Sequence, residues 1–138
     1  MHCLSKTEMA YFKAAKAIST LSDHKQKIGC VVVNQHRIIS SGSNSKTKCH
    51  KMQAILDKKR YGCECPGKVH SEVAALIPLI NSGVDLSRAS IFVYRQHKDG
   101  TTAIARPCPS CYELIKSCGI RKIYYSTNSG YKMEKIEL

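Results

Sequence analysis

Two short motifs contain side chains that could bind a metal ion. His70 and Glu72 lie in "VHSEVAAL", where an apolar run begins, and Cys108 and Cys111 lie in "RPCPSC". Two ligands three positions apart on the first turn of a helix face the same side, so both thiols could reach one ion. The helix N-terminus also favours thiolate over thiol. Alone, however, this C-x-x-C pair fits a metal site, a thioredoxin-like redox pair or two unrelated buried thiols equally well.

The two motifs together indicate a more specific chemistry. A catalytic zinc ion takes three protein ligands and leaves a fourth position for water, and His70, Cys108 and Cys111 would supply the three. Zinc lowers the pKa of its bound water to about 7. Glu72, close to the metal without being a ligand, could accept that proton and return it to a leaving group. Without the cysteines, His70 and Glu72 would indicate only the start of a helix.

The elements around these motifs must bring two helix N-termini together. An earlier helix is predicted over about residues 6–22, starting at a capping box. The helix after the histidine motif begins near Ser71 and should stop by Gly83, and Pro78 inside it predicts a kink or an early end. The helix after the cysteine motif ends at Gly119.

Apolar, β-branched segments predict four strands between these helices. They cover residues 27–34, 37–40, 89–95 and 121–127, with a hairpin joining the first two. The segment from Gly42 to Lys68 is polar and basic and is predicted as a loop, and the tail "YKMEKIEL" fits either a fifth strand or a short helix. This alternation predicts an α/β protein, with a mixed sheet and helices packed on it.

Length and composition predict one soluble domain. The chain has 138 residues, which is one domain's worth, and it lacks an apolar run of the roughly 18 residues needed to span a membrane. Its first residues do not resemble a secretory signal, so we expect a single domain over residues 1–138 and a cytoplasmic location. Eight cysteines in such a chain favour thiols or metal ligands over a disulfide framework. The net charge of +12 favours anionic partners such as nucleotides or nucleic acids.

The combined pattern H-x-E…P-C-x-x-C resembles the signature of the zinc-dependent cytidine and deoxycytidylate deaminase superfamily. The resemblance spans about residues 6–127 and includes "IGCVVV", "GSN" and "GIRKIYYS". It implies a three-layer α/β/α cytidine deaminase-like fold, in which a mixed sheet of about five strands carries helices on both faces. It also implies one catalytic zinc ion and assembly as a homo-oligomer.

The resemblance implies a role for each residue of the two motifs. His70, Cys108 and Cys111 would bind zinc, and Glu72 would be the catalytic proton shuttle. Zinc-bound hydroxide would attack C4 of cytosine. Glu72 would take the proton of the water, protonate N3 and help ammonia leave.

Three further residues are predicted to bind the substrate. Asn44 in "GSN" matches the asparagine that contacts the sugar in many members, although a turn residue tolerant of positive φ is an equally good interpretation. Ser71 replaces the alanine most often found between the histidine and the glutamate, and its backbone N–H would still touch the pyrimidine. Arg106 stands where tRNA adenosine deaminases commonly have a glutamate, which argues against adenosine as the substrate.

The basic residues favour a substrate that carries phosphate. The segment 46–68 is rich in Lys and Arg, and Arg95, Lys98 and Arg106 flank the cysteine motif. Free nucleosides are uncharged and need no such groups, so dCMP or CMP is the favoured substrate. A single-stranded DNA or RNA cytosine deaminase is the alternative, with tyrosines as candidate stacking platforms. A non-catalytic, zinc-stabilised nucleic-acid-binding module and a thioredoxin-like oxidoreductase are the alternatives from other classes.

A second cluster could hold a structural zinc ion close to the basic segment. It consists of Cys49, His50, Cys63 and Cys65. The C-H and C-x-C spacings are not the usual zinc-finger pattern, so free thiols in a loop are the favoured interpretation.

Overall fold

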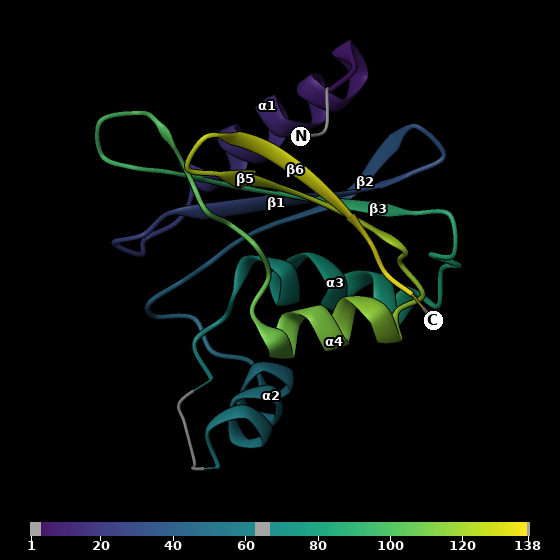
Figure 1. Ribbon diagram of the computed structural model, residues 1–138. Coiled ribbons are helices and arrows are strands. Elements are labelled where there is room, and N and C mark those ends of the chain that lie inside the picture. The colour runs from purple at the N-terminus through teal and green to yellow at the C-terminus, as the bar shows by residue number, and fades with distance from the viewer. Residues whose placement is uncertain (1–3, 63–66, 138) are drawn as a thin grey trace.

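A mixed β-sheet with helices on both faces forms the centre of the structure (Figure 1). The computed structural model describes residues 4–62 and 67–137. In this part of the chain the sheet has six strands, ordered β2-β1-β3-β5-β6, with the short β4 paired to β3. They are β1 (Ile28–Asn34), β2 (Arg37–Ser43), β3 (Ser90–Gln96), β4 (Thr102–Ala103), β5 (Lys122–Thr127) and β6 (Gly130–Lys135). β3 and β5 run parallel, and the other pairs are antiparallel.

Helices cover the two faces of the sheet unequally. The described helices are α1 (Lys6–Ser19), α2 (Lys51–Tyr61), α3 (Ser71–Ser82) and α4 (Pro109–Ser117). α1 covers one face, α3 and α4 lie side by side on the other, and α2 lies beyond them and contacts α4 (Figure 1). This arrangement confirms the predicted three-layer α/β/α fold. No helix within the described ranges is both long and apolar enough to cross a membrane.

The central strand β1 is buried on both faces. Cys30 and Val32 belong to the core between the sheet and helices α3 and α4. Val31 and Val33 belong to the core on the opposite face, together with Phe12 of α1. The uninterrupted apolar run of β1 therefore reflects a strand that is covered by helices on both sides.

Local sequence signals account for most of the element boundaries. Gln35 and His36 have positive φ angles of 52° and 67°, as a two-residue hairpin turn requires, and the predicted hairpin is confirmed. α1 begins with the predicted capping box of Ser5 and Glu8 but ends at Ser19, before residue 22. Residues of the C-terminal tail form strand β6, which pairs with β5. Of the two structures predicted for the tail, a strand or a short helix, the strand is therefore correct.

α3 begins at Ser71 and ends at its C-cap Gly83, where φ is 70°, as predicted. Of the two effects predicted for Pro78, a kink or an early end, the early end is wrong, because the helix continues past the proline. A proline in a helix interior costs about 3 kcal/mol. Leu79, directly after the proline, is buried in the core, which offsets part of this cost. The Ser40 hydroxyl also donates a hydrogen bond of 2.6 Å to the Ala75 carbonyl, which ties this part of α3 to β2.

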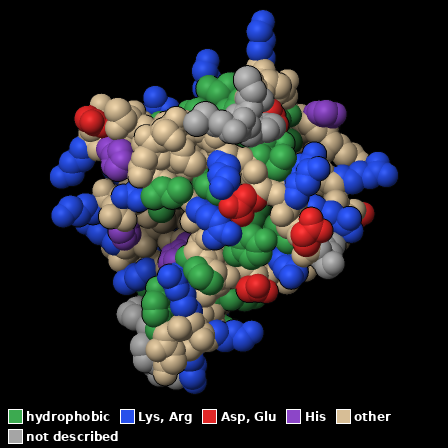
Figure 2. Space-filling model, viewed as in Figure 1, with side chains coloured by type: hydrophobic (Ala, Val, Ile, Leu, Met, Phe, Trp, Pro, Cys, Tyr) green, Lys and Arg blue, Asp and Glu red, His purple; other side chains and the backbone are tan. Residues whose placement is uncertain are grey.

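α2 lies in the segment that was predicted as a loop. His50 is its N-cap, with Nδ1 accepting the Met52 N–H at 3.0 Å, and Gly62 ends the helix with a φ of 72°. Its buried residues are Gln53 and Asp57, so the apolar stripe that identifies an amphipathic helix is missing. Lys and Arg side chains outnumber acidic ones on the visible face of the molecule, including the region of α2 (Figure 2).

Candidate active site

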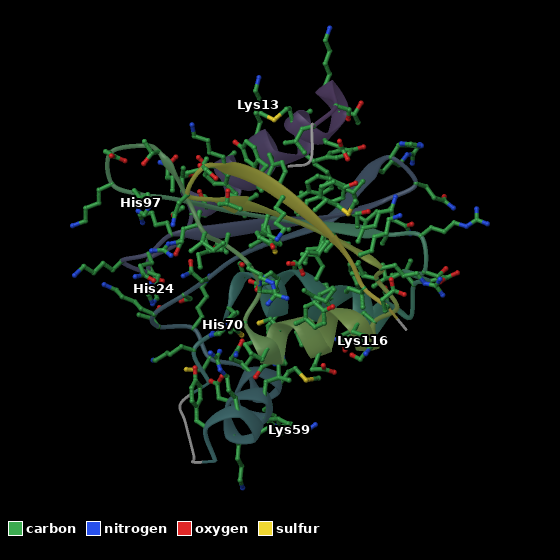
Figure 3. The ribbon with its side chains drawn as sticks, in the orientation of Figure 1. Lys13, His24, Lys59, His70, His97 and Lys116 are labelled. Carbon is green, nitrogen blue, oxygen red and sulfur yellow. The ribbon has the colours of Figure 1, made fainter. Side chains whose placement is uncertain are left out.

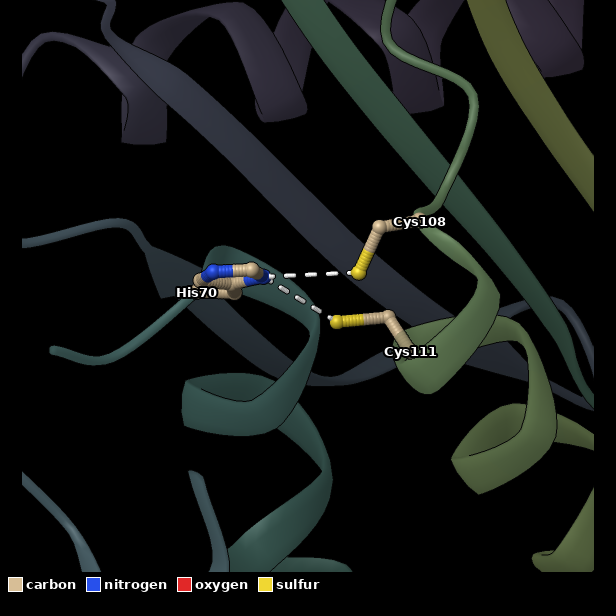
Figure 4. Close-up of side chains that lie close together, drawn as sticks. All are labelled: His70, Cys108 and Cys111. Atoms are coloured by element: carbon tan, nitrogen blue, oxygen red, sulfur yellow. Dashed lines mark hydrogen bonds between the residues drawn. The ribbon is translucent and has the colours of Figure 1, made fainter. Parts of the chain in front are cut away.

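The N-termini of α3 and α4 converge and bring the two sequence motifs together. His70, which lies between the sheet and α2 (Figure 3), is the N-cap of α3, and Cys108 is the N-cap of α4. Neither side chain caps its own helix. Both point toward each other and toward Cys111 in the first turn of α4 (Figure 4). Pro109 occupies the first position of α4, where its missing N–H costs nothing.

His70, Cys108 and Cys111 have the geometry of a zinc site. His70 Nδ1 lies 3.7 Å from Cys108 Sγ and 3.4 Å from Cys111 Sγ, and the three ligand atoms lie within 4.8 Å of one another. Usual Zn–N and Zn–S bond lengths in a tetrahedral site require nitrogen–sulfur separations of about 3.6 Å. The donor set therefore fits zinc. Within residues 4–62 and 67–137, no other group of three His, Cys, Asp or Glu side chains is placed to hold a metal ion.

The contact between the two thiols shifts their pKa values in opposite directions. The pKa of Cys108 is lowered to about 3, chiefly by the hydrogen bond from Cys111 and also by His70. The pKa of Cys111 is raised by the same hydrogen bond and by burial. The hydrogen bond with Cys108 raises the pKa of His70. Because metal ligands must be deprotonated, a cation held by both sulfurs would release any proton that the two thiols still carry.

Glu72 lies in the first turn of α3, beside the three ligand residues. Its side chain is buried and interacts electrostatically with His70 and Cys108. Burial raises the pKa of Glu72, and a hydrogen bond of 2.5 Å from the Ser71 hydroxyl to Glu72 Oε1 opposes this effect. A carboxyl group with a raised pKa exchanges protons closer to neutral pH than an exposed glutamate does, as a general acid–base requires.

A cavity of about 320 Å³ opens over these residues, which is within the range of small-molecule sites. Its lining includes His24, Gln26, Asn44, Ser45, His70, Ser71, Glu72, Arg95, Arg106 and Cys108. His24 lies on the same side of the molecule as His70 (Figure 3). His24 and Gln26 could not be predicted as site residues, because the loop before β1 contains no motif with ligand or catalytic spacing.

Asn44 joins the loop before β1 to the end of β2 and also lines the cavity. Its Oδ1 accepts the Ser22 hydroxyl at 2.6 Å and the Ile28 N–H at 2.9 Å, and its Nδ2 donates to the Gln26 carbonyl at 2.7 Å. Its φ is not positive, so the interpretation as a positive-φ turn residue is wrong. An amide nitrogen has two hydrogens, and Nδ2 of Asn44 donates one of them to the Gln26 carbonyl.

Arg106 and Ser71 also line the cavity, and each has a structural partner. The guanidinium of Arg106 donates to both carboxylate oxygens of Glu134, at 3.0 and 3.1 Å. Ser71 is buried; its hydroxyl is bonded to Glu72, and its carbonyl accepts the thiol of Cys30 at 3.1 Å. The charge of Arg106 is therefore already balanced within the protein.

Part of the predicted second metal site, Cys63 and Cys65, lies outside the described residues. Cys49 is exposed, and Nδ1 of His50 is used as the N-cap acceptor of α2. Neither residue belongs to a metal-ligand group within the part of the chain that the structure describes.

Comparison with known protein families identifies the class of this protein. The family described as "Cytidine and deoxycytidylate deaminase zinc-binding region" matches residues 5–127, and the chain belongs to this family. The superfamily and the zinc ion predicted from the two motifs are confirmed. No curated protein sequence matches the chain significantly.

Solved deaminase structures share the fold. The apo dCMP deaminase from the cyanophage S-TIM5 has a TM-score of 0.64 and 25% sequence identity, covering 89% of this chain and 84% of the phage chain. The phage enzyme in complex with dCMP and dUMP gives 0.63 and 24%, covering 90% and 83%. Cytidine deaminase from Burkholderia pseudomallei gives 0.64 and 16%, covering 96% and 93%. Together with the family match, the likeness to the apo phage enzyme indicates zinc-dependent deamination of a cytosine-type compound.

Proposed function

We propose that this chain is a zinc-dependent hydrolytic deaminase of a cytosine nucleotide, dCMP or CMP, which releases ammonia and the uracil nucleotide. The observation that carries the proposal is the position of Glu72. This buried carboxyl group stands beside three metal-ligand side chains in one cavity. A purely structural zinc site usually has four protein ligands and gains nothing from a proton carrier.

In the proposed reaction, His70, Cys108 and Cys111 hold zinc and Glu72 carries protons. A zinc ion there supplies Lewis acidity, which lowers the pKa of a bound water to about 7. Glu72 accepts a proton from the water as the water oxygen bonds to C4 of cytosine, and it delivers this proton to N3. Glu72 then transfers the second proton of the water to the amino group at C4, so that the C4–N bond breaks and ammonia leaves. Burial of Glu72 favours the protonated form, which suits a carboxyl group that must hold a proton between two transfers.

Asn44, Ser71 and Arg106 are the proposed substrate contacts. The second Nδ2 hydrogen of Asn44 would bind the sugar. The backbone N–H of Ser71, in the first turn of α3, has no helical partner of its own and would bind the pyrimidine. Arg106 would have to exchange Glu134 for the substrate, because Glu134 holds its guanidinium.

Two other side chains that line the cavity support a substrate that carries phosphate. Arg95 lines the cavity and pairs with no carboxylate among the described residues; its Nη1 donates to the Ile104 carbonyl at 3.4 Å. Nδ1 of His24 accepts the Gln26 N–H at 3.0 Å, so its Nε2 carries a hydrogen and can donate. We assign the phosphate to Arg95 and His24, with Arg106 as a further cationic contact.

A substrate panel tests this proposal. Purified protein is incubated with cytidine, deoxycytidine, CMP, dCMP, single-stranded DNA or RNA, and ammonia release or mass change is measured. We expect turnover of dCMP or CMP to exceed that of the nucleosides, and Arg95→Gln to raise KM for the nucleotide while the control Lys98→Gln does not. Equal turnover of cytidine and dCMP would contradict the phosphate assignment. No turnover of any compound would contradict the proposed function.

A single-stranded DNA or RNA cytosine deaminase is the second candidate, and the surface of α2 favours it. Tyr61 is 57% exposed, and the Arg60 guanidinium lies 5.0 Å from the centre of its ring. Lys59 lies on the same helix (Figure 3). Cationic grooves with exposed aromatic side chains are typical of single-strand binding. Turnover of the polynucleotides alone, reduced by Tyr61→Ala, would select this candidate.

Two candidates from other classes give different results with the same purified protein. A non-catalytic, zinc-stabilised nucleic-acid-binding module would bind DNA in a salt-sensitive manner and turn over no cytosine compound. A thioredoxin-like oxidoreductase would reduce disulfides through Cys108 and Cys111 without zinc.

We further propose that residues 1–138 form one catalytic domain that acts in the cytoplasm as a homo-oligomer. The cysteines at the site are used as metal ligands, which suits a reducing compartment. Light scattering of the purified protein would test the homo-oligomer, which a monomeric mass at working concentration would contradict.

A further inference from the structure

Helix α2 buries two polar side chains and exposes an apolar one. Gln53 is 0% exposed and Asp57 is 8% exposed, whereas Ile55 on the same helix is 58% exposed. Burial of an amide or a carboxylate is costly unless the group is hydrogen-bonded. This pattern is the reverse of the usual one, in which apolar side chains are buried and polar side chains are exposed. It indicates that Gln53 and Asp57 have a specific role on the buried face of α2.

Gln53 connects α2 directly to the histidine of the metal site. Its Oε1 accepts the backbone N–H of His70 at 3.0 Å, and its Nε2 donates to Asp57 Oδ1 at 3.0 Å. The orientation of the amide is fixed, because a backbone N–H only donates and a carboxylate only accepts. His70 precedes the first turn of α3, so its N–H has no helical carbonyl as an alternative partner.

The same helix contacts the cysteine half of the site. Ser110 lies between the two cysteines, and its hydroxyl donates to the Leu56 carbonyl of α2 at 3.4 Å. Met52 and Leu56 pack against the core that includes residues of α3 and α4. α2 therefore spans the two helix N-termini that carry the metal ligands, although it contributes no ligand itself.

We propose that Gln53 is a positioning residue for the metal site. Through its hydrogen bond with the His70 N–H, it fixes the direction in which the imidazole points toward Cys108 and Cys111. The neighbouring Val69 is held separately, by the Lys48 carbonyl at 3.0 Å and the Ser45 N–H at 2.9 Å. Gln53 is thus the side chain that holds the ligand residue itself. This role rests on the proposed assignment of His70 as a zinc ligand and is independent of the substrate.

Gln53→Met tests the role, because it keeps the length of the side chain and removes both hydrogen bonds. Zinc affinity is measured by competition with a chelator, and the geometry of the site by the visible absorption of the cobalt-substituted protein. We expect a zinc affinity about 10- to 100-fold weaker than that of the wild type, with a changed cobalt spectrum. The control Ile55→Met, on the exposed face of α2, should leave both measurements unchanged.

Exchange of the donor and the acceptor gives a second test. Gln53→Glu keeps an acceptor for the His70 N–H but sets two carboxylates side by side, so we expect it to weaken zinc binding. Adding Asp57→Asn supplies an amide that donates to the new carboxylate and should restore zinc affinity to near the wild-type value. This comparison decides the question if Gln53→Met does not fold.

The inference would be overturned if Gln53→Met had wild-type zinc affinity and an unchanged cobalt spectrum. It would also be overturned if the double variant bound zinc no better than Gln53→Glu alone. None of these measurements uses a substrate. A protein that binds zinc in this Gln53-dependent way but turns over no cytosine compound would contradict the proposed function and leave the role of Gln53 intact.

Discussion

At the scale of single residues, the position of protons determines what the site can do. The hydrogen bond from Cys111 lowers the pKa of Cys108 to about 3, and His70 lowers it further. Glu72, buried against the same residues, has a raised pKa. Glu72, a carboxyl group that takes up protons readily, thus lies beside side chains that can bind a cation. Proton transfer next to a metal ion requires both a proton carrier and a cation site.

We expect Glu72→Gln to lower the rate of deamination by about 10²- to 10⁴-fold, the usual contribution of a general acid–base. The substitution keeps the size of the side chain and removes its ability to carry a proton. Ammonia release and zinc content are measured on the same preparation, with Glu113→Gln on α4 as a control. Loss of zinc together with activity, or unchanged activity with zinc bound, would contradict the role of Glu72.

The metal-ligand residues could be predicted because their spacing is local. Cys108 and Cys111 are one helical turn apart, and His70 stands at a recognisable helix start, so the sequence itself contains the pattern. Gln53 and His24 could not be predicted in this way. Their importance depends on contacts between distant segments, such as the hydrogen bond from the His70 N–H to Gln53 across 17 positions.

At the scale of elements, the close approach of α3 to β2 sets the position of the histidine motif. A side chain at Gly42 of β2 would begin 2.5 Å from the Ser71 carbonyl oxygen and 2.6 Å from the Ala75 nitrogen. These are backbone atoms of α3, so the helix would have to move as a unit. Glycine at this position therefore allows the start of α3 to lie against the sheet.

We expect Gly42→Ala to lower the free energy of unfolding by about 1–3 kcal/mol, the usual cost of overpacking. The displacement of α3 should also weaken zinc binding through His70. Urea unfolding and chelator competition measure the two effects, with Ser41→Ala at the neighbouring exposed position as the control. A Gly42→Ala protein with wild-type stability and zinc affinity would show that α3 does not depend on this contact.

The terminal strand β6 is held beside the site by an ion pair whose contribution to stability depends on pH. Glu134 on β6 accepts two hydrogen bonds from Arg106 and one from the Tyr125 hydroxyl at 2.6 Å. The hydrogen bond from Arg106 lowers the pKa of Glu134. Because the folded-state pKa lies below the unfolded one, the stabilisation is complete above the unfolded pKa and is lost as the pH falls through the folded pKa.

We expect Glu134→Gln to reduce the free energy of unfolding at neutral pH by about 0.5–1 kcal/mol, since the pair is partly exposed. The difference from the wild type should shrink as the pH is lowered from neutral through the folded-state pKa of Glu134, where the wild-type carboxylate becomes protonated too. Urea unfolding of both proteins across this range measures the difference. A difference that is the same at both ends would contradict the contribution of the Glu134 charge.

Most elements could be predicted because their signals are local as well. The capping box of α1, the turn at Gln35 and His36, and the apolar runs of β1 and β3 are all visible in the sequence. α2 could not be predicted, since its buried face carries Gln53 and Asp57 and its stability comes from contacts with α3 and α4. The continuation of α3 past Pro78 likewise depends on tertiary packing, which outweighs a local penalty.

At the scale of the whole molecule, the sheet topology explains why residues 38 positions apart form one site. β2 and β3 both run antiparallel to β1 and therefore point in the same direction. The chain leaves both strands at the same edge of the sheet, and each connection leads to a helix that carries ligands. This order of strands brings the starts of α3 and α4 together, and with them His70 and the two cysteines.

The net charge of +12 gives the molecule a general attraction for anions, and Lys and Arg prevail on the face seen in Figure 2. This field acts on a nucleotide and on a polynucleotide alike. The choice between them depends on the cavity that Arg95 and His24 line, where we propose that these two side chains bind one phosphate.

The most direct test of the proposed function is ammonia release from dCMP and CMP by the purified protein before and after removal of zinc. We expect release by the zinc-loaded protein, loss of release after chelation and recovery when zinc is restored. Release should be absent or very slow in Glu72→Gln with zinc still bound. A zinc-loaded protein that releases no ammonia from dCMP, CMP or any other cytosine compound, or release that continues after zinc removal, would contradict zinc-dependent cytosine deamination at this site.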